Sequence, residues 1–496
     1  MAECMHSEDF FRLRLEHMID VRHPLAVLAQ RMPWQRLEHA IAQRLARAPR
    51  SQAVEALDDA IDLFGEQRAR TRRTSRAGRP RVPLRIMISL LYLKHAFNES
   101  DEGVVQRWRD TPRWQYFSGC AYYEDRLPCD ATTLVKFRQW LGEEGVEELL
   151  AQTINVAVEL ELIEPQALEH LVVDSTVQHK AIAHPSDSRL LEVARVKLVA
   201  AAKNAGVQLK QTFAKEGQRL RRKAAGYAHA RQFKRLRRTI ERQATIVGRL
   251  AREIERKATA LTQAAREALG ESLAKAQQIM AQSRQRKANA GHPKLYAWHA
   301  PEVDCISKGK ARSPYEFGVK VGVASTLQHN LVVGARAFHG NPYDGHTLWA
   351  QLEQATILMQ DNAVAPTEVY VDLGYRGVEA DNPQVRIVHR GRWRCLSRSD
   401  RRRLKRRQAI EPIIGHLKAD CRMDRCHLKG ERGDRLHAVL CAAGYNIRWL
   451  LRMIAKRGIG PLVAVLLRLL LRLLQTIEQA KRALTTPMPG TLRAVG

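Results

Sequence analysis

Three acidic residues that are far apart along the chain stand in settings that suit metal binding: Asp174, Asp372 and Glu411. Each aspartate follows a β-branched, apolar run of the kind that forms a buried strand. A carboxylate that leaves such a strand is costly unless it is paired, and binding a cation is one way to offset that cost. Capping of the next turn is the alternative role for Asp174.

If the three acids meet, their oxygens are the ligands that Mg²⁺ prefers. Two divalent ions also relieve the mutual repulsion of clustered carboxylates. Such ions, roughly 4 Å apart, activate an attacking oxygen and stabilise the leaving oxygen of a phosphodiester. The sequence therefore predicts a site for two Mg²⁺ ions, with Mn²⁺ as a substitute, at Asp174, Asp372 and Glu411.

Glu411 is predicted to lie on a short helix that also carries two cations. Arg407 precedes it by four residues and Lys418 follows it by seven, so all three share one helix face. Beside a metal-binding acid the two cations can hold phosphate oxygens, which predicts DNA contacts at Arg407 and Lys418. The alternative is a solvated ion pair on a surface helix, worth roughly 0.3–0.5 kcal/mol.

The elements that must position these residues belong to an α/β fold. Without a long helical insertion, they form a small mixed sheet flanked by helices. If the strands of Asp174 and Asp372 are neighbours, both acids emerge from the same sheet end, and Glu411 approaches from a helix packed on the sheet. The predicted elements are strands at 169–177, 315–324 and 331–337, a helix at 347–359, strands at 368–372 and 385–390, and a helix from 399.

Other residues compete for these roles. Asp304 and Asp344 are further carboxylates, but Asp344 stands in a predicted turn, where an aspartate commonly bonds its own backbone, so we rank it below Asp372. Cys421 and Cys426 lack the two-residue spacing that is usual for zinc. We expect the cysteines to be reduced thiols of a cytoplasmic protein.

Charge and composition point to a polyanionic partner. The chain has 496 residues, 45% of them hydrophobic, and a net charge of +30 with a pI near 10.2. Such a surface repels itself, so nucleic acid is the first candidate partner and an anionic membrane the second. We expect no signal peptide and no membrane span, because the most apolar segment, residues 461–474, is too short and contains two arginines. A cytoplasmic protein that binds nucleic acid fits these features.

The N-terminal third is predicted to be all-α. Residues 1–75 form a helical segment, and residues 76–165 form short helices joined by tight turns, like a helix-turn-helix bundle. Pro83 begins one of these helices and Asp130 caps another. The bundle either contacts DNA or is a plain helical domain with polar outer positions.

Three cations are the candidate DNA contacts of this region. Lys136 and Arg138 lie near the start of the helix that Asp130 caps. Arg79 belongs to the basic stretch 78–81 (GRPR), which is either extended in a minor groove or an ordinary linker.

A helical insertion is predicted at residues 189–291, and a C-terminal helix and tail, suited to packing or oligomer contacts, at 456–496. Apolar residues in the insertion recur every seven positions, which predicts a coil that packs on itself or between molecules. Arg235 and Arg238 belong to a cationic run that is either a solvated face or a helix laid along DNA backbone. The heptad positions are Phe233, Ile240, Val247, Ile254 and Leu261.

These motifs together resemble the DDE transposases of bacterial insertion sequences, most closely the insertion-sequence-five group. The resemblance covers roughly residues 80–455. The matching pieces are 172–176 (VVDST), 371–375 (VDLGY), the set of Arg407, Glu411 and Lys418, 430–434 (GERGD) and 444–446 (GYN).

The resemblance implies an RNase H-like core at residues 166–188 and 292–455, with Asp174, Asp372 and Glu411 as metal ligands. It also implies binding to terminal inverted repeats of double-stranded DNA and a homodimeric complex that pairs two transposon ends. The resemblance further implies a two-step transposition reaction. Hydrolysis at the transposon end releases a 3′-hydroxyl, which then attacks a phosphate of target DNA.

The chain departs from the family pattern in two places. A related signature has a tyrosine three residues before the arginine, and here that residue is Leu404. A function of the family that needs this tyrosine does not apply to this chain, unless Tyr375 occupies the same place in the folded protein. The insertion is also unusual in size.

Three rival functions stay open at this point. A nuclease of the same fold cuts DNA without joining strands, and a non-catalytic DNA-binding protein uses the acids only as caps. A basic membrane-surface protein uses the helix at 466–474. Strand joining, Mg²⁺-dependent cutting and liposome flotation distinguish these functions.

Overall fold

The computed structural model describes residues 13–47, 81–259, 261–284, 294–307, 314–378 and 381–485, with side chains described as far as residue 457. The chain divides into two compact units. The first unit consists of Met1–Leu141, Glu148–Pro165 and Ala443–Gly496, and the second of Gly142–Glu147 and Gln166–Ala442. The second unit contains the sheet and the three predicted acids.

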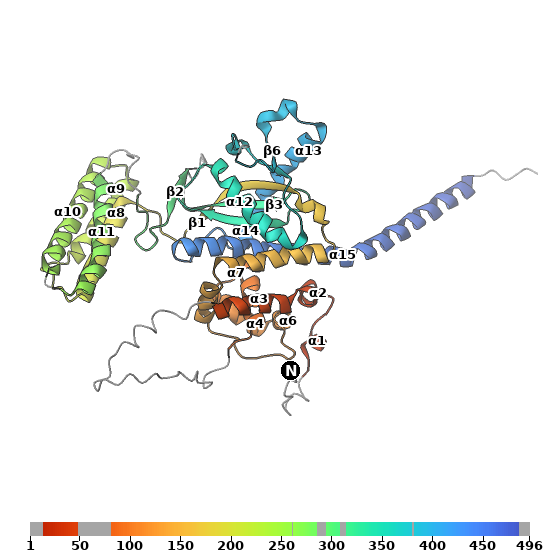
Figure 1. Ribbon diagram of the computed structural model, residues 1–496, viewed down its shortest axis with the longest axis horizontal. Coiled ribbons are helices and arrows are strands. Elements are labelled where there is room, and N and C mark those ends of the chain that lie inside the picture. Colours follow the sequence, from red (N-terminus) through yellow and green to blue (C-terminus); the bar gives the residue numbers. More distant parts are fainter. Residues whose placement is uncertain are drawn as a thin grey trace, which may run out of the picture. The chain divides into compact units, whose positions relative to one another are not determined.

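A six-stranded mixed sheet forms the centre of the second unit (Figure 1). The central strand β1 is antiparallel to β3 and parallel to β5, and β5 is parallel to β6. The outer edge of β3 pairs antiparallel with both β2 and β4. The strands are β1 (His170–His179), β2 (Asp304–Ser307), β3 (Tyr315–Thr326), β4 (Val332–Phe338), β5 (Glu368–Tyr370) and β6 (Arg386–Val388).

The predicted α/β class is confirmed, and each predicted strand is present within a few residues. Strand β2 was not predicted, because four residues without a clear alternation give little signal. Strand β1 extends two residues beyond the predicted end at Val177, since it continues to His179. The pairing with β3 explains this continuation, because it extends along β1 from Leu171 to His179.

Helices cover the sheet and carry the remaining site residues. Helix α12 (Asp344–Met359) packs on β3 and β4, and α14 (Ile410–Asp420) packs on β1. Helix α13 (Arg398–Arg406) leads into α14 through the short helix η7 (Arg407–Ala409). One buried cluster joins this helical segment to the strands, and it consists of Val172, Leu327, Tyr370, Val388, Leu404 and Ile410.

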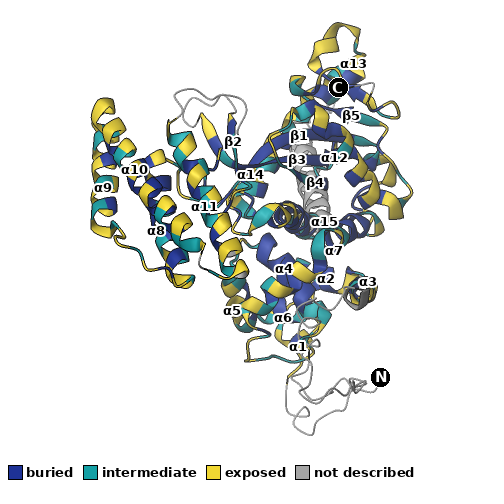
Figure 2. Ribbon diagram, turned by 60° about the vertical axis from the view of Figure 1, so that its left-hand side comes forward, coloured by how far each residue is buried: buried dark blue, intermediate teal, exposed yellow. Residues whose placement is uncertain are grey.

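The insertion forms a four-helix bundle with its own hydrophobic core. Its helices are α8 (Asp187–Asn204), α9 (Ala214–His229), α10 (Phe233–Ala258) and α11 (Gln263–Arg284). The heptad residues Val247 and Ile254 are buried in this core, whereas Phe233 is 67% exposed. Figure 2 shows the buried side of α10 facing the other bundle helices. The middle of the heptad seam therefore packs within the chain.

A buried ion-pair network ties the end of β1 to the beginning of α15 (Gly430–Thr485). Lys180 Nζ lies 2.8 Å from Asp434 Oδ1 and 2.7 Å from Glu302 Oε1, and these three side chains are at most 5% exposed. The backbone N–H of Gly430 donates to Glu302 Oε1 at 2.8 Å. The residues of the GERGD stretch thus have a structural role in the second unit.

The described part of the first unit is helical, as predicted. The side chain of Ser100 accepts from the Gly103 N–H and caps α5, and Asp130 accepts from the Thr132 N–H and caps α7. Arg79 lies outside the described residues. The helices are α1 (Leu15–Met18), α2 (Pro24–Arg31), α3 (Trp34–Arg47), α4 (Leu84–Ala96), α5 (Asp101–Asp110), α6 (Pro112–Phe117) and α7 (Ala131–Glu159). Among the described residues, no helix is both long and apolar enough to span a membrane.

Candidate active site

Asp174 lies on β1, and Asp372 lies at the corresponding position two residues beyond the end of the neighbouring parallel strand β5. Val172 of β1 pairs with Tyr370 of β5, and each aspartate follows its paired residue by two positions. Neighbouring strands are about 4.8 Å apart. Because β5 ends at Tyr370, Asp174 is in the part of β1 that has lost this neighbour, so its carboxylate has room beside the sheet. Both carboxylates are partly exposed.

The backbone orients both carboxylates. The N–H of Ser175 donates to Asp174 Oδ1 at 2.7 Å, and the N–H of Gly374 donates to Asp372 Oδ1 at 2.8 Å. The second bond caps the short helix η5 (Leu373–Tyr375), which begins directly after Asp372. Each acid therefore has one oxygen held by the chain.

Arg407 reaches Asp174 from η7, and Glu411 lies on α14, which packs on β1. Arg407 is largely buried, and its Nη1 lies 3.2 Å from Asp174 Oδ2. Glu411 follows one turn later, in the first turn of α14, and is exposed. Ile410, beside Glu411, packs in the same cluster as Val172 and Tyr370. Lys418 is half-buried two turns further along α14.

A fourth acid, Asp344, lies next to Asp372. A Cβ placed on Gly374 would be 3.0 Å from Asp372 Oδ1 and 3.3 Å from Asp344 Oδ2. On its other side, Asp344 Oδ1 forms an ion pair with Lys320 Nζ at 3.0 Å. The sequence ranks Asp344 as a turn residue and does not predict its proximity to Asp372. This proximity arises from the packing of α12 against η5.

Tyr375 is fully buried beside these acids. Burial, together with the charges of Asp174, Asp344 and Asp372, raises the pKa of Tyr375 well above its usual value. Among the described residues, the Thr347 side chain interacts with the Tyr375 hydroxyl, but not in ordinary hydrogen-bond geometry. Leu404, by contrast, belongs to the hydrophobic cluster, so that position has no polar role.

The donor set fits hard divalent cations. Asp174, Asp344 and Asp372 all act electrostatically on the Tyr375 hydroxyl, and Glu411 lies in the first turn of α14. In this structure, no three of these four described acids bring their carboxylate oxygens within 4.8 Å of one another. Oxygen ligands of this kind suit Mg²⁺ and Mn²⁺. Because the acids outnumber their partners Arg407 and Lys320, the pocket favours additional positive charge.

A cationic surface lies on the segment that leads into α14. The short helix η6 (Arg390–Cys395) and α13 present exposed lysine and arginine side chains, and α13 is anchored by an ion pair between Arg386 Nη2 and Asp400 Oδ2 at 2.7 Å. The RSDRRRLKR sequence of α13 is strongly basic and indicates this cationic surface, which was not predicted. The exposed cations are Arg390, Arg392, Arg394, Arg398, Arg402, Lys405 and Arg406.

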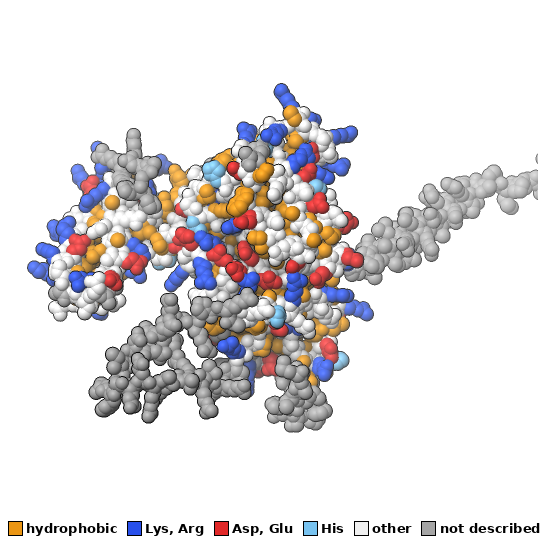
Figure 3. All heavy atoms as spheres, viewed as in Figure 1, with side chains coloured by type: hydrophobic (Ala, Val, Ile, Leu, Met, Phe, Trp, Pro, Cys, Tyr) orange, Lys and Arg blue, Asp and Glu red, His pale blue; other side chains and the backbone are white. Residues whose placement is uncertain are grey.

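Other predicted DNA contacts differ in their accessibility. Arg235 and Arg238 are exposed near the start of α10, and Figure 3 shows lysine and arginine side chains gathered on the outer side of the bundle. Lys136 is exposed on α7. These three side chains are open to a phosphate backbone.

The prediction of a DNA contact at Arg138 is wrong. Its side chain is 3% exposed and binds both carboxylate oxygens of Asp101, each at 3.0 Å. Lys94 Nζ approaches the same carboxylate at 2.7 Å. The guanidinium therefore neutralises a buried acid of the first unit.

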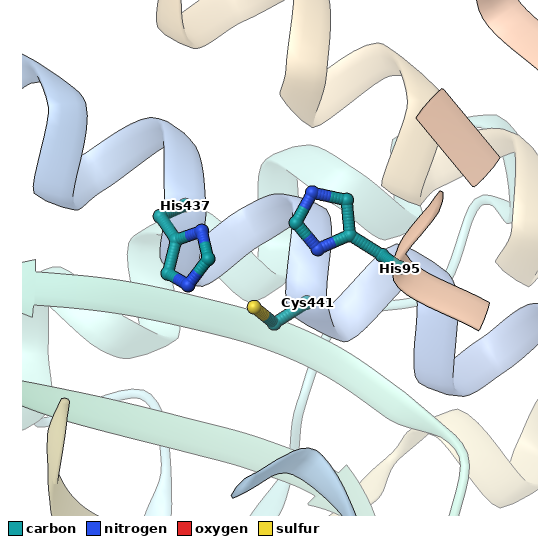
Figure 4. Close-up of side chains that lie close together, drawn as sticks. All are labelled: His95, His437 and Cys441. Atoms are coloured by element: carbon teal, nitrogen blue, oxygen red, sulfur yellow. The ribbon is translucent and has the colours of Figure 1, made fainter. Parts of the chain in front are cut away.

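Among the described residues of the second unit, thiol and imidazole groups do not form a zinc site with the usual four ligands. Burial and the Asp434 carboxylate raise the pKa of Cys426 to about 12, so it is a neutral thiol. Figure 4 shows His437 and Cys441 on successive turns of α15, where His437 Nε2 lies 2.9 Å from the Arg422 carbonyl oxygen. Within this unit they supply two ligands, fewer than a structural zinc ion takes.

Comparison with known proteins identifies two families in this chain. Residues 43–140 match the family described as Transposase domain (DUF772), and residues 290–447 match the Transposase DDE domain. The second match contains Asp372 and Glu411, whereas Asp174 precedes it. A Rhizobium meliloti protein named "Uncharacterized protein ORF8 in nfe locus" is 38% identical over 227 residues, which are 46% of this chain and 96% of that protein. No solved structure matches. The chain belongs to the DDE transposases, DNA-binding enzymes that use divalent metal ions.

Proposed function

We propose that this transposase binds the terminal inverted repeats of an insertion sequence of the insertion-sequence-five group, cleaves the DNA there and joins the ends to target DNA. Asp174, Asp372 and Glu411 are the acids of its active site. The observation that supports this proposal most directly is the corresponding placement of Asp174 on β1 and of Asp372 beyond the end of the parallel strand β5, with the helix that carries Glu411 packed on β1.

The strand order supports an RNase H-like core. Strands β4, β3 and β1 form an antiparallel series, and β5 and β6 follow in parallel on the other side of β1. The first acid is on the central strand and the second directly follows its parallel neighbour. The bundle α8–α11 is then an insertion after the first strand.

Asp174, Asp372 and Glu411 would hold two Mg²⁺ ions, which would supply charge stabilisation for the reacting phosphodiester. The chain contributes positioning. Backbone N–H groups fix one oxygen of Asp174 and one of Asp372, and Arg407 balances the charge of Asp174. Arg407 and Lys418 orient the phosphate. Hydrolysis at the transposon end releases a 3′-hydroxyl, which then attacks a target phosphate in the same pocket.

DNA outside the pocket is held by charge. The exposed cations of η6 and α13 lie on the segment that enters the active site, and Arg235, Arg238 and Lys136 provide further backbone contacts. Binding of this kind is independent of sequence and weakens with salt. A homodimer pairs two transposon ends in the bacterial cytoplasm, at the nucleoid.

The test uses the purified full-length protein and a duplex that contains the element's terminal repeat. With Mg²⁺, the parent should produce a discrete nick at the repeat end on a denaturing gel, and EDTA should abolish it. Asp174→Asn, Asp372→Asn and Glu411→Gln should each lose cleavage by more than a hundredfold while still binding the duplex. Asp424→Asn, an exposed acid on the turn after α14, is the matched control.

A pre-cleaved end and a plasmid test the joining step. The proposal expects a covalent end–plasmid product from the parent protein. A protein that nicks the duplex but forms no joined product is a nuclease. Equal cleavage by the parent and by any of the three acid variants would remove that acid from the active site.

A further inference from the structure

The active-site pocket contains an acid beyond the three of the family motif. Asp344 begins α12, and its Oδ2 and the Oδ1 of Asp372 flank the same point beside Gly374, at 3.3 and 3.0 Å. Resting on the proposed function above, we propose that Asp344 is a fourth metal ligand, which shares an ion with Asp372.

A second observation points into the same space. The Tyr375 side chain is fully buried, and the Thr347 side chain interacts with its hydroxyl, but not in ordinary hydrogen-bond geometry. That hydroxyl is within electrostatic reach of Asp174, Asp344 and Asp372. A buried hydroxyl whose hydrogen bond is poorly formed is costly. Water in the coordination sphere of an ion held by these acids would satisfy it, because Mg²⁺ retains several waters.

The backbone around Gly374 is arranged for two carboxylates. The Gly374 N–H binds Asp372 Oδ1 at 2.8 Å, and the missing side chain leaves room for Asp344 Oδ2 to approach. A methyl group at this position would contact both acids more closely than ordinary packing allows. The glycine therefore keeps the space between them open.

Asp344 has a structural alternative, namely its ion pair with Lys320. Lys320 Nζ lies 3.0 Å from Asp344 Oδ1 and its side chain is 9% exposed. This pair uses Oδ1 and leaves Oδ2, the oxygen nearer Asp372, directed toward the shared space. The ion pair with Lys320 and the binding of a metal ion are distinguishable, because only the second role requires the metal ion.

The experiment measures Mn²⁺ binding to the full-length protein by electron paramagnetic resonance of free Mn²⁺, without DNA or turnover. Asp344→Asn keeps the side-chain size, and we expect it to weaken binding by at least the roughly tenfold that is typical of disturbing a metal site. Gly374→Ala should weaken binding as well. Lys320→Met removes the ion pair but keeps the ligand, so its Mn²⁺ affinity should equal or exceed that of the parent. Asp424→Asn should bind like the parent.

Three outcomes overturn the proposal. If Asp174→Asn and Asp372→Asn lose Mn²⁺ while Asp344→Asn binds like the parent, Asp344 is outside the metal site and the proposed function stands. If Lys320→Met reproduces the loss seen with Asp344→Asn, the acid acts through its ion pair. If none of the acid variants changes Mn²⁺ binding, the metal pocket of the proposed function fails too. Circular dichroism on each variant confirms that it is folded before binding is compared.

Discussion

Replacing Asp101 by asparagine should loosen the first unit by removing the one carboxylate between two buried cations. Arg138 and Lys94, with side chains 3% and 8% exposed, both contact this carboxylate. Removing one member of a buried ion pair costs about 3–5 kcal/mol, because the remaining charge is left without compensation.

The pKa of Asp101 gives a second measure of the same interaction. Burial alone would raise the pKa, but Arg138 and Lys94 lower it from 3.8 to about 2. The difference of roughly 1.8 units corresponds to about 2 kcal/mol at neutral pH. Because the folded-state pKa is depressed, this stability is present above pH 3.8 and is lost as the pH falls from there toward 2.

Hydrogen exchange with mass spectrometry on the full-length protein measures this effect locally. A loss of about 2–4 kcal/mol corresponds to roughly 30–900-fold lower protection in peptides from α4, α5 and the start of α7. Lys136→Ala, two residues from Arg138 and exposed, should leave protection unchanged and lower DNA affinity. If Asp101→Asn keeps parental protection while Arg138→Ala lowers the salt dependence of DNA binding, the structural assignment of Arg138 is refuted.

Three further changes test other parts of the molecule. Asp434→Asn should destabilise the second unit by about 3 kcal/mol, because Lys180 loses a buried partner, and a melting temperature equal to the parent's would contradict this. Replacing the exposed Arg402 and Lys405 of α13 together by glutamine should reduce the slope of log K against log salt by about 2, as followed by fluorescence anisotropy; an unchanged slope places α13 off the DNA. Gly142→Ala should cost about 1–3 kcal/mol in thermal unfolding, since Gly142 has φ 64° and ψ −170°, a conformation that side chains resist; a neutral effect would mean that the kink in α7 relaxes.

Local sequence signals predicted the elements of the fold well. Asp130 was predicted to cap a helix, and its side chain accepts from the Thr132 N–H at the start of α7. The apolar runs before Asp174 and Asp372 form strands because both are buried in the sheet. The sequence did not predict that these two strands pair in parallel. Nearly two hundred residues separate them, so their pairing could only be assumed.

The errors arose where long-range packing decides the role of a side chain. Arg138 was taken as a surface cation, but its partner Asp101 is on another helix, which periodicity does not reveal. Asp344 was assigned to a turn, whereas the packing of α12 brings it to Asp372. The heptad pattern of α10 is the same for a coil and a bundle, and the core shared with α8 and α11 selects the bundle.

The most direct test of the shared pocket replaces Mg²⁺ by Fe²⁺ and adds ascorbate and peroxide, so that radicals formed at the bound ion cut the nearby backbone. Mapping the fragments should give cuts beside Asp174, Asp372 and Glu411 together, and excess Mg²⁺ should suppress all of them in parallel. Cuts confined to one of these segments, or lying elsewhere in the chain, would contradict a site built by three acids.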